Sequence, residues 1–474
     1  MKNQDTNIMV QDPATIQLKW YQRVLINSNK KLVTTPAANR VISIDWCKGF
    51  AIFWIIVDHL TWVWLPDNIL WYARFLYLWL GFLGPVTFLF FAGVNTTMSY
   101  RAARAKNIPH ALIHYETFRR MMGLLVVVII SRMIDYFAAI GSLTPLTIFF
   151  QWDILQAIAF SAILTVPLLK FSPRTRLIIA AVILMASYPF YQYILRYQTE
   201  SLVAQILNVV MYAPYLSFGP LPITGGMGCP LFPMIAFTII GSIVIDLLLP
   251  IINGKKTEMT TTPGIITQKN HPKSKTPSNI FEILLLASFA IIVFSLLFGS
   301  GPNEDPFFQP EASLVLSQLH QNQIFQNWQY VPQFLIINHP MYFLFNVGVE
   351  SCFFLLPFYY FEIITRKNYA PSWSTRTLSF FGQFSLSYYA YSFIFALMGI
   401  TTDILGTWIG SLLTLIVLTL LFRFFIRKAY GGGLVEFVMV TFAINSSFPP
   451  SIKDVQAVYP EKVAQFTQGE SGTF

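Results

Sequence analysis

The segment from residue 40 to 64, RVISIDWCKGFAIFWIIVDHLTWVW, constrains this chain most, because it is apolar enough to cross a membrane yet carries charge toward both ends. Its apolar centre and flanks supply the roughly 20 residues that a transmembrane helix needs. The ionisable residues in it are Arg40, Asp45, Lys48, Asp58 and His59. Such groups are costly at membrane depth and are therefore functional candidates. The alternative is that the basic residues snorkel to one surface while His59 sits in an interfacial aromatic belt.

The composition of the whole chain indicates a polytopic membrane protein. Of its 474 residues 55% are hydrophobic and only 11% are charged, more apolar surface than a soluble fold buries. The three cysteines show no paired or metal-ligand spacing and the six histidines form no tight ligand cluster, so we expect no disulfide framework and no metal site.

Apolar runs bounded by Pro, Gly or charged residues predict an all-α fold of about ten transmembrane helices. They span residues 41–63, 78–99, 120–140, 150–170, 175–196, 230–252, 279–299, 340–363, 377–400 and 403–426.

Basic residues alternate between the connections of these spans, which predicts the orientation. Nearly all Lys and Arg fall in the two terminal regions and in every second connection; the exceptions are Lys48, Arg74, Arg132 and Arg196. By the positive-inside rule both termini are cytoplasmic. The net charge of +9 is then explained by topology, and we expect no nucleic-acid partner.

This map divides the chain into a cytoplasmic tail (1–39), a transmembrane domain (40–445) and a second cytoplasmic tail (446–474). Two outward connections, 197–229 and 300–338, are long enough to be lids, binding loops or disordered segments. No separate soluble domain or tandem repeat is evident.

Polar residues within the membrane domain form two predicted layers. Toward the outer face lie Asp58, His59 and Asp153, and Glu350 lies near mid-membrane, where it needs a partner or must be protonated. The inner layer, with Arg40 at its edge, includes Asp45, Lys48, Asn95, Ser99, Arg101, Arg120, Glu362 and Glu436.

The two layers suit a substrate with a polyanionic head and a thin arm. The inner Arg and Lys would hold the head, while the arm reaches His59. Lys48 and His59 are eleven residues apart, or roughly 16 Å along a helix, which a pantetheine arm can span. A transporter also places polar residues inside its helix bundle, and the arginines serve equally as topology determinants.

Several stretches together resemble the transmembrane acyltransferases that include heparan-alpha-glucosaminide N-acetyltransferase and its bacterial and archaeal relatives. The first is RVISIDWCKGFAIFWIIVDH, similar to that family's first span. The others, in family order, are GPVTFLFFAGVNTTMSYR (84–101), WDILQAIAF (152–160), PLFPMIAFTIIG (230–241), FGQFSLSYYAYS (381–392) and GLVEF (433–437). The chain departs from the pattern at Lys48, where the family has Arg, and at Ser392, where a His is often found.

The resemblance implies transfer of an acyl group, usually acetyl, from cytoplasmic acyl-CoA to a sugar, glycan or glycolipid at the opposite face. By resemblance, Asp45 and Lys48 shape the donor site. His59 is the natural general base, or accepts the acyl group itself, and a carboxylate from another span, Asp153 or Glu350, would orient it.

From this we expect an acyl-CoA-dependent enzyme of the plasma membrane, in contact with membrane lipid. Homo-oligomerisation stays open. The main rival is a transporter of a small anionic or sugar substrate, although no inverted repeat is evident. A third alternative is a non-catalytic scaffold, which predicts that His59→Ala leaves function intact.

Overall fold

The computed structural model describes residues 41–138, 154–196, 231–259, 277–303, 309–336, 339–365, 372–396, 398, 400–428, 434–436 and 438–439. Within these ranges the chain is helical and contains no β-strand. The α-helices are α2 (Ile42–Trp64), α3 (Leu70–Leu80), α4 (Pro85–Ala105), α5 (His110–Ala138), α7 (Ile154–Leu168), α8 (Pro173–Arg196), α10 (Leu231–Met259), α11 (Pro277–Gly299), α12 (Gln309–Leu319), α13 (Pro340–Phe358), α14 (Trp373–Gln383), α15 (Ser385–Ala396) and α16 (Ile404–Lys428).

Five helical segments among the described residues are long and apolar enough to cross a membrane. They are Asp67–Ala105, Leu231–Ile252, Asn279–Gly299, Pro340–Ile364 and Ile404–Ile426. The all-α, membrane-spanning class predicted from the sequence is therefore confirmed. The count of about ten crossings and the cytoplasmic placement of both termini stay predictions.

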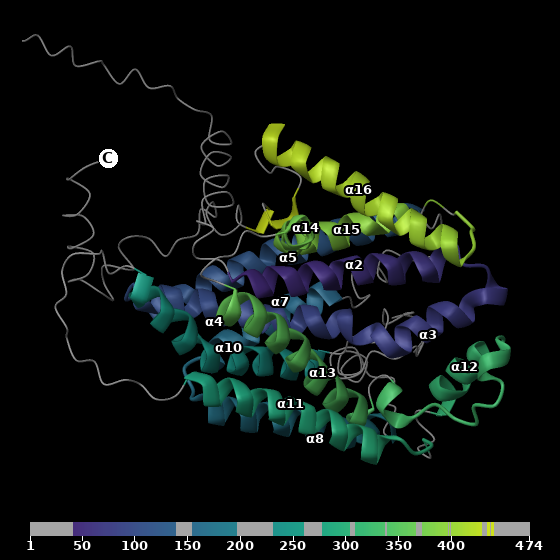
Figure 1. Cartoon of the computed structure of the whole chain (residues 1–474), viewed down its shortest axis with the longest axis horizontal. Coiled ribbons are helices and arrows are strands. Elements are labelled where there is room, and N and C mark those ends of the chain that lie inside the picture. Colours follow the sequence, from purple (N-terminus) through teal and green to yellow (C-terminus); the bar gives the residue numbers. More distant parts are fainter. Residues whose placement is uncertain are drawn as a thin grey trace, which may run out of the picture.

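Helix α2 lies in the middle of the molecule and packs against α3, α4, α13, α14, α15 and α16. In Figure 1 it runs through the centre, with α16 on one side and α8 and α11 on the other. Its buried residues join two apolar clusters: Ile52, Ile56 and Leu60 belong to one, and Ile44 and Cys47 to the other. Because α2 is unbroken from Ile42 to Trp64, it defines two ends of the molecule, called here the Lys48 end and the His59 end.

Glycines bring two pairs of helices close together, α2 with α14 and α4 with α10. A Cβ on Gly49 of α2 would collide with the carbonyl oxygen of Leu378, and one on Gly382 of α14 with that of Asp45. Gly93 of α4 and Gly241 of α10 make the same kind of close approach to each other's helix. Small residues at such crossings let helix backbones pack directly, as in many membrane proteins.

Two predicted spans are interrupted. The span predicted at 377–400 consists of α14 and α15, which meet at Phe384, and α4 begins at Pro85, after a short 3-10 helix from Gly81 to Leu83. The sequence FGQFSLSYY across the first break contains no Pro and no charged residue, so the span pattern alone did not predict it.

The long connection predicted at 300–338 is folded over residues 309–336. Helix α12 and two short 3-10 helices build a small apolar cluster, which includes Val315, Leu319 and Phe325 and packs against Trp71 and Phe75 of α3. Figure 1 shows α12 beside α3 at one edge of the molecule. This segment is called the cap below. The other long connection, 197–229, lies outside the described residues.

Candidate active site

His59 lies in the last third of α2 with its ring against Tyr389 of α15. The two ring centroids are 5.5 Å apart and the planes meet edge to face at 63°. The Nδ1 atom of His59 is buried, and Tyr389 is 5% exposed. Edge-to-face aromatic contacts add about 0.5–1.5 kcal/mol beyond area burial, so the contact helps to fix the imidazole.

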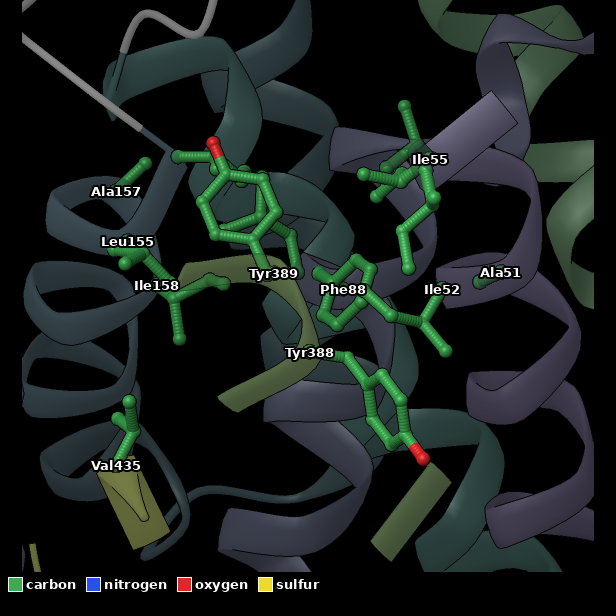
Figure 2. Packing of buried hydrophobic residues seen from close by; sticks show 14 of the residues in the cluster. Ala51, Ile52, Ile55, Phe88, Leu155, Ala157, Ile158, Tyr388, Tyr389 and Val435 are labelled. Atoms are coloured by element: carbon green, nitrogen blue, oxygen red, sulfur yellow. The ribbon is translucent and has the colours of Figure 1, made fainter. Parts of the chain in front are cut away.

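Tyr389 and its neighbour Tyr388 point in different directions. Figure 2 shows Tyr389 among side chains from α2, α4 and α7, with Phe88 between the two tyrosines. The Tyr388 hydroxyl instead lies 2.8 Å from that of Thr419 on α16. Tyr388 therefore anchors α15 to α16, whereas Tyr389 belongs to the surroundings of His59. The sequence reasoning did not single out Tyr389, although it falls within the motif FGQFSLSYYAYS.

Asp58 lies next to His59 in sequence but interacts with different side chains. The Trp62 side chain, one turn along α2, and the positive charge of Arg74 of α3 both act on its carboxylate, and the Arg74 guanidinium lies 4.8 Å from the centre of the Trp62 ring. Arg74 is 7% exposed and donates through Nε to Gln318 of the cap at 2.7 Å. Arg74, an exception to the charge alternation, thus joins α3 to the cap.

Glu350 of α13 is fully buried and meets Thr87 of α4. The Thr87 hydroxyl lies 2.7 Å from Glu350 Oε2 and 3.0 Å from the carbonyl oxygen of Phe82. A hydroxyl donates one hydrogen, so both contacts are satisfied together only if the carboxyl supplies a hydrogen of its own. The geometry therefore fits a protonated, neutral Glu350. Its role in orienting His59 stays a proposal.

At the Lys48 end, two carboxylates cap helix starts. Glu362, in the π-helix Tyr359–Ile364 that continues α13, accepts from the backbone N–H of Ile42 at 2.7 Å and so caps α2. Glu436, from the motif GLVEF, accepts from the backbone N–H groups of Leu386 and Ser387 at 3.0 and 3.3 Å and caps α15. Carboxylates are favourable there because the first N–H groups of a helix lack internal partners.

Lys48 stands close to the second of these caps. Burial raises the pKa of the Glu436 carboxyl, while hydrogen bonds to it and the positive charge of Lys48 lower it. Since Gly382 of α14 lies directly against the backbone of Asp45, the first, fifth and sixth motifs meet in one place. Residues near 45, 382 and 436 are far apart in sequence, so only the fold reveals this convergence.

A buried ion cluster that the sequence reasoning missed also lies at this end. Asp246 of α10 accepts from Nε and Nη2 of Arg101 at 2.8 and 2.6 Å, and from the guanidinium of Arg176. Arg176 is fully buried and also donates to Ser242 at 2.7 Å. Two arginines thus share one aspartate across α4, α8 and α10. The sequence feature that could have revealed this cluster is Asp246, a single carboxylate inside an apolar span.

The remaining residues predicted to bind the donor differ in their exposure and in whether they form ion pairs. Asn95 and Ser99 are exposed and one turn apart on α4. Arg120 pairs within its own helix with Glu116 at 2.5 Å, where both side chains are partly exposed. Arg101 is committed to Asp246 through two of its nitrogens, which favours a structural part for it. Arg40 and Asp153 lie outside the described residues.

The arrangement as a whole is a helix with Lys48 toward one end and the His59 imidazole toward the other. Because α2 is continuous, the separation of Lys48 and His59 along it keeps the value of roughly 16 Å expected for eleven helical residues. Among the side chains that the structure describes, no group of three or more His, Cys, Asp or Glu is placed to hold a metal ion.

Comparison with known families agrees with the resemblance predicted from the motifs. Residues 40–269 match the family model described as heparan-alpha-glucosaminide N-acetyltransferase, catalytic. The match covers the first four motifs, while the FGQFSLSYYAYS and GLVEF motifs lie beyond it. No curated protein matches the chain significantly.

Proposed function

Because residues 40–269 match the catalytic domain of the heparan-alpha-glucosaminide N-acetyltransferase family, we propose that this membrane protein transfers an acetyl group from cytoplasmic acyl-CoA to a sugar, glycan or glycolipid. The family match indicates an acetyltransferase with a sugar-type acceptor. The acyl-CoA donor, transfer to the opposite face and a plasma-membrane location are the parts we add.

The observation that carries the proposal is the single helix joining Lys48 to His59. Acyl-CoA has a polyanionic nucleotide head and a long pantetheine arm that ends in the thioester. Lys48 and the exposed Asn95 and Ser99 would receive the head, and the arm would follow α2 toward His59. The length of roughly 16 Å along the helix matches such an arm.

At the His59 end, the chemistry needs a group that removes a proton from the acceptor hydroxyl or amine as it attacks the thioester carbonyl. The imidazole of His59 is suited to this because its ordinary pKa lies near 6.5. The second route is nucleophilic: His59 takes the acyl group from the thioester and then passes it to the acceptor. The Tyr389 ring restrains the imidazole in either case, and the hydroxyl of Tyr389 is a candidate donor to the developing oxyanion.

One observation favours a transporter instead: the break between α14 and α15 creates a half-helix start inside the bundle, a feature that transporters use to bind anions. In this chain, however, the carboxylate of Glu436 occupies that start. The site that an anionic cargo would use is therefore already filled by the protein itself.

The test is the shift in melting temperature of the detergent-purified protein with acetyl-CoA, free CoA and ATP. A ligand present at 100 times its dissociation constant stabilises the native state by about 2.7 kcal/mol. We expect a shift with acetyl-CoA and CoA but not with ATP. Lys48→Ala should reduce the shift, whereas Lys106→Ala, a lysine at the exposed end of α4, should not. A protein that melts normally but responds equally to ATP, or to none of the three, contradicts the donor assignment.

A further inference from the structure

Glu436 is bonded to the first turn of α15 by several hydrogen bonds. In addition to the two backbone N–H groups that it accepts from, its Oε2 atom accepts from the Ser387 hydroxyl. The Ser387 oxygen in turn accepts from the backbone N–H of Val435 at 2.9 Å. The GLVEF segment and the start of α15 therefore hold each other through four hydrogen bonds.

The helix start of α15 needs these hydrogen bonds because it lies inside the protein. The break at Phe384 leaves the first N–H groups of α15 without helical partners, and water is not at hand to satisfy them: Ser385 and Ser387 are 2% and 0% exposed. An unsatisfied buried polar group costs about 1–3 kcal/mol. The carboxylate of Glu436, with Lys48 close to it, meets this need.

Tyr389 follows this capped turn directly. It is two residues after Ser387, within one helical turn, and its ring is the one that packs against His59. A helix that frays at its start moves its first turn most, because capping effects fall off within that turn. Whatever fixes the first turn of α15 therefore also fixes the ring beside the imidazole.

We propose that Glu436 is a positioning residue for the candidate active site, holding Tyr389 against His59 through the start of α15. Glu436 does not touch the reacting groups; it acts through the helix. The proposal rests on the proposed function only for its effect on catalysis, since the placement of the Tyr389 ring can be measured without any acyl transfer.

The first readout is the rate at which diethylpyrocarbonate modifies His59, followed by mass spectrometry of the α2 peptide. Glu436→Ala should raise this rate, because a displaced Tyr389 uncovers the imidazole. Glu436→Gln keeps an oxygen that accepts from Leu386 and Ser387 and should remain near the wild type. Ser172→Ala removes the cap of α8, an N–H···O bond of 3.2 Å from Thr175, and controls for cap loss elsewhere. If Glu436→Ala does not fold, Ser387→Ala removes only part of the network and should give the same change, but smaller.

The second readout is steady-state transfer from acetyl-CoA. Displacing a catalytic group by about 1 Å can cost about 100-fold in rate, so Glu436→Ala should lower kcat by up to that factor with KM for acetyl-CoA unchanged. Unchanged labelling of His59 in Glu436→Ala, or equal changes in Ser172→Ala, would overturn the positioning role. A wild-type protein without transferase activity would refute the proposed function, while the labelling rates would still decide the part of Glu436.

Discussion

At the scale of single residues, the structure separates ionisable groups that a sequence pattern treats alike. Asp58 and His59 are adjacent on α2, yet one is associated with Arg74 near the cap and the other with Tyr389. Neighbours on a helix point about 100° apart, which makes the carboxylate next to the histidine in sequence a poor orienting partner for it.

Glu350 gives a prediction about protonation. Since the contacts of Thr87 fit a neutral carboxyl, Glu350→Gln replaces one neutral hydrogen-bonding group by another and should change stability by less than about 1 kcal/mol. Glu350→Ala leaves Thr87 without this partner and removes buried volume, and should cost about 1–3 kcal/mol. Thermal unfolding in detergent measures both. Equal losses in the two variants would show that the carboxylate charge is needed.

The residues predicted from the sequence differ in how far the fold supports them. His59 was identifiable because an imidazole at a span end is unusual, and Lys48 because charge within a span is costly. Tyr389 gave no comparable signal, since an aromatic residue in an apolar run is ordinary, and Glu436 was identified only as an inner-layer carboxylate within the motif GLVEF. The meaning of both depends on contacts with residues that are distant in sequence: Tyr389 with α2, and Glu436 with α15.

At the scale of elements, apolar runs predicted where helices form but not where they break or how closely they cross. Each of the ten predicted segments is helical in the described part of the chain, whereas the break at Phe384 lies inside one of them, at a point with no Pro or charged residue to mark it. The break depends on a tertiary contact, because Glu436 accepts from the first backbone N–H groups of α15 and so lets a new helix begin there.

The crossing of α2 and α14 gives a prediction about packing. Gly382→Ala would drive a methyl group into the Asp45 carbonyl and force the helices apart. Overpacking typically costs about 1–3 kcal/mol, and the closeness here predicts the upper part of that range or beyond. Gly301→Ala is the control, because a Cβ at Gly301 has no atom within 4 Å. Similar melting temperatures for the two variants would contradict the tight crossing.

The cluster of Arg101, Arg176 and Asp246 predicts a large loss of stability when the Asp246 charge is removed. Asp246→Asn leaves the fully buried Arg176 without its countercharge, which typically costs about 3–5 kcal/mol. Glu116→Gln breaks the partly exposed pair with Arg120 and should cost about 0.5 kcal/mol or less. Unfolding measurements compare the two. A small effect of Asp246→Asn would mean that Arg176 finds another partner or reaches water.

At the scale of the whole molecule, the proposed function requires the acetyl group to move in one direction, from the cytoplasm to the opposite face. The charge alternation predicts that the Lys48 end faces the cytoplasm, and α2 then connects a cytoplasmic donor to an acceptor at the opposite face. The cap packs at the His59 end, where it covers part of α3 and contacts Arg74. In the part of the chain that the structure describes, five helical segments are long and apolar enough to embed this arrangement in a membrane.

The most direct measurement of the central claim uses sealed proteoliposomes with sugar acceptors inside and acetyl-CoA labelled in the acetyl group outside. For protein inserted with its Lys48 end outward, we predict labelled acetylated acceptor inside the vesicles. His59→Ala should lower this rate by about 100-fold or more, as expected for loss of a general base, and His114→Ala should leave it unchanged. The absence of labelled product inside the vesicles, or product that forms equally with His59→Ala, would contradict the account.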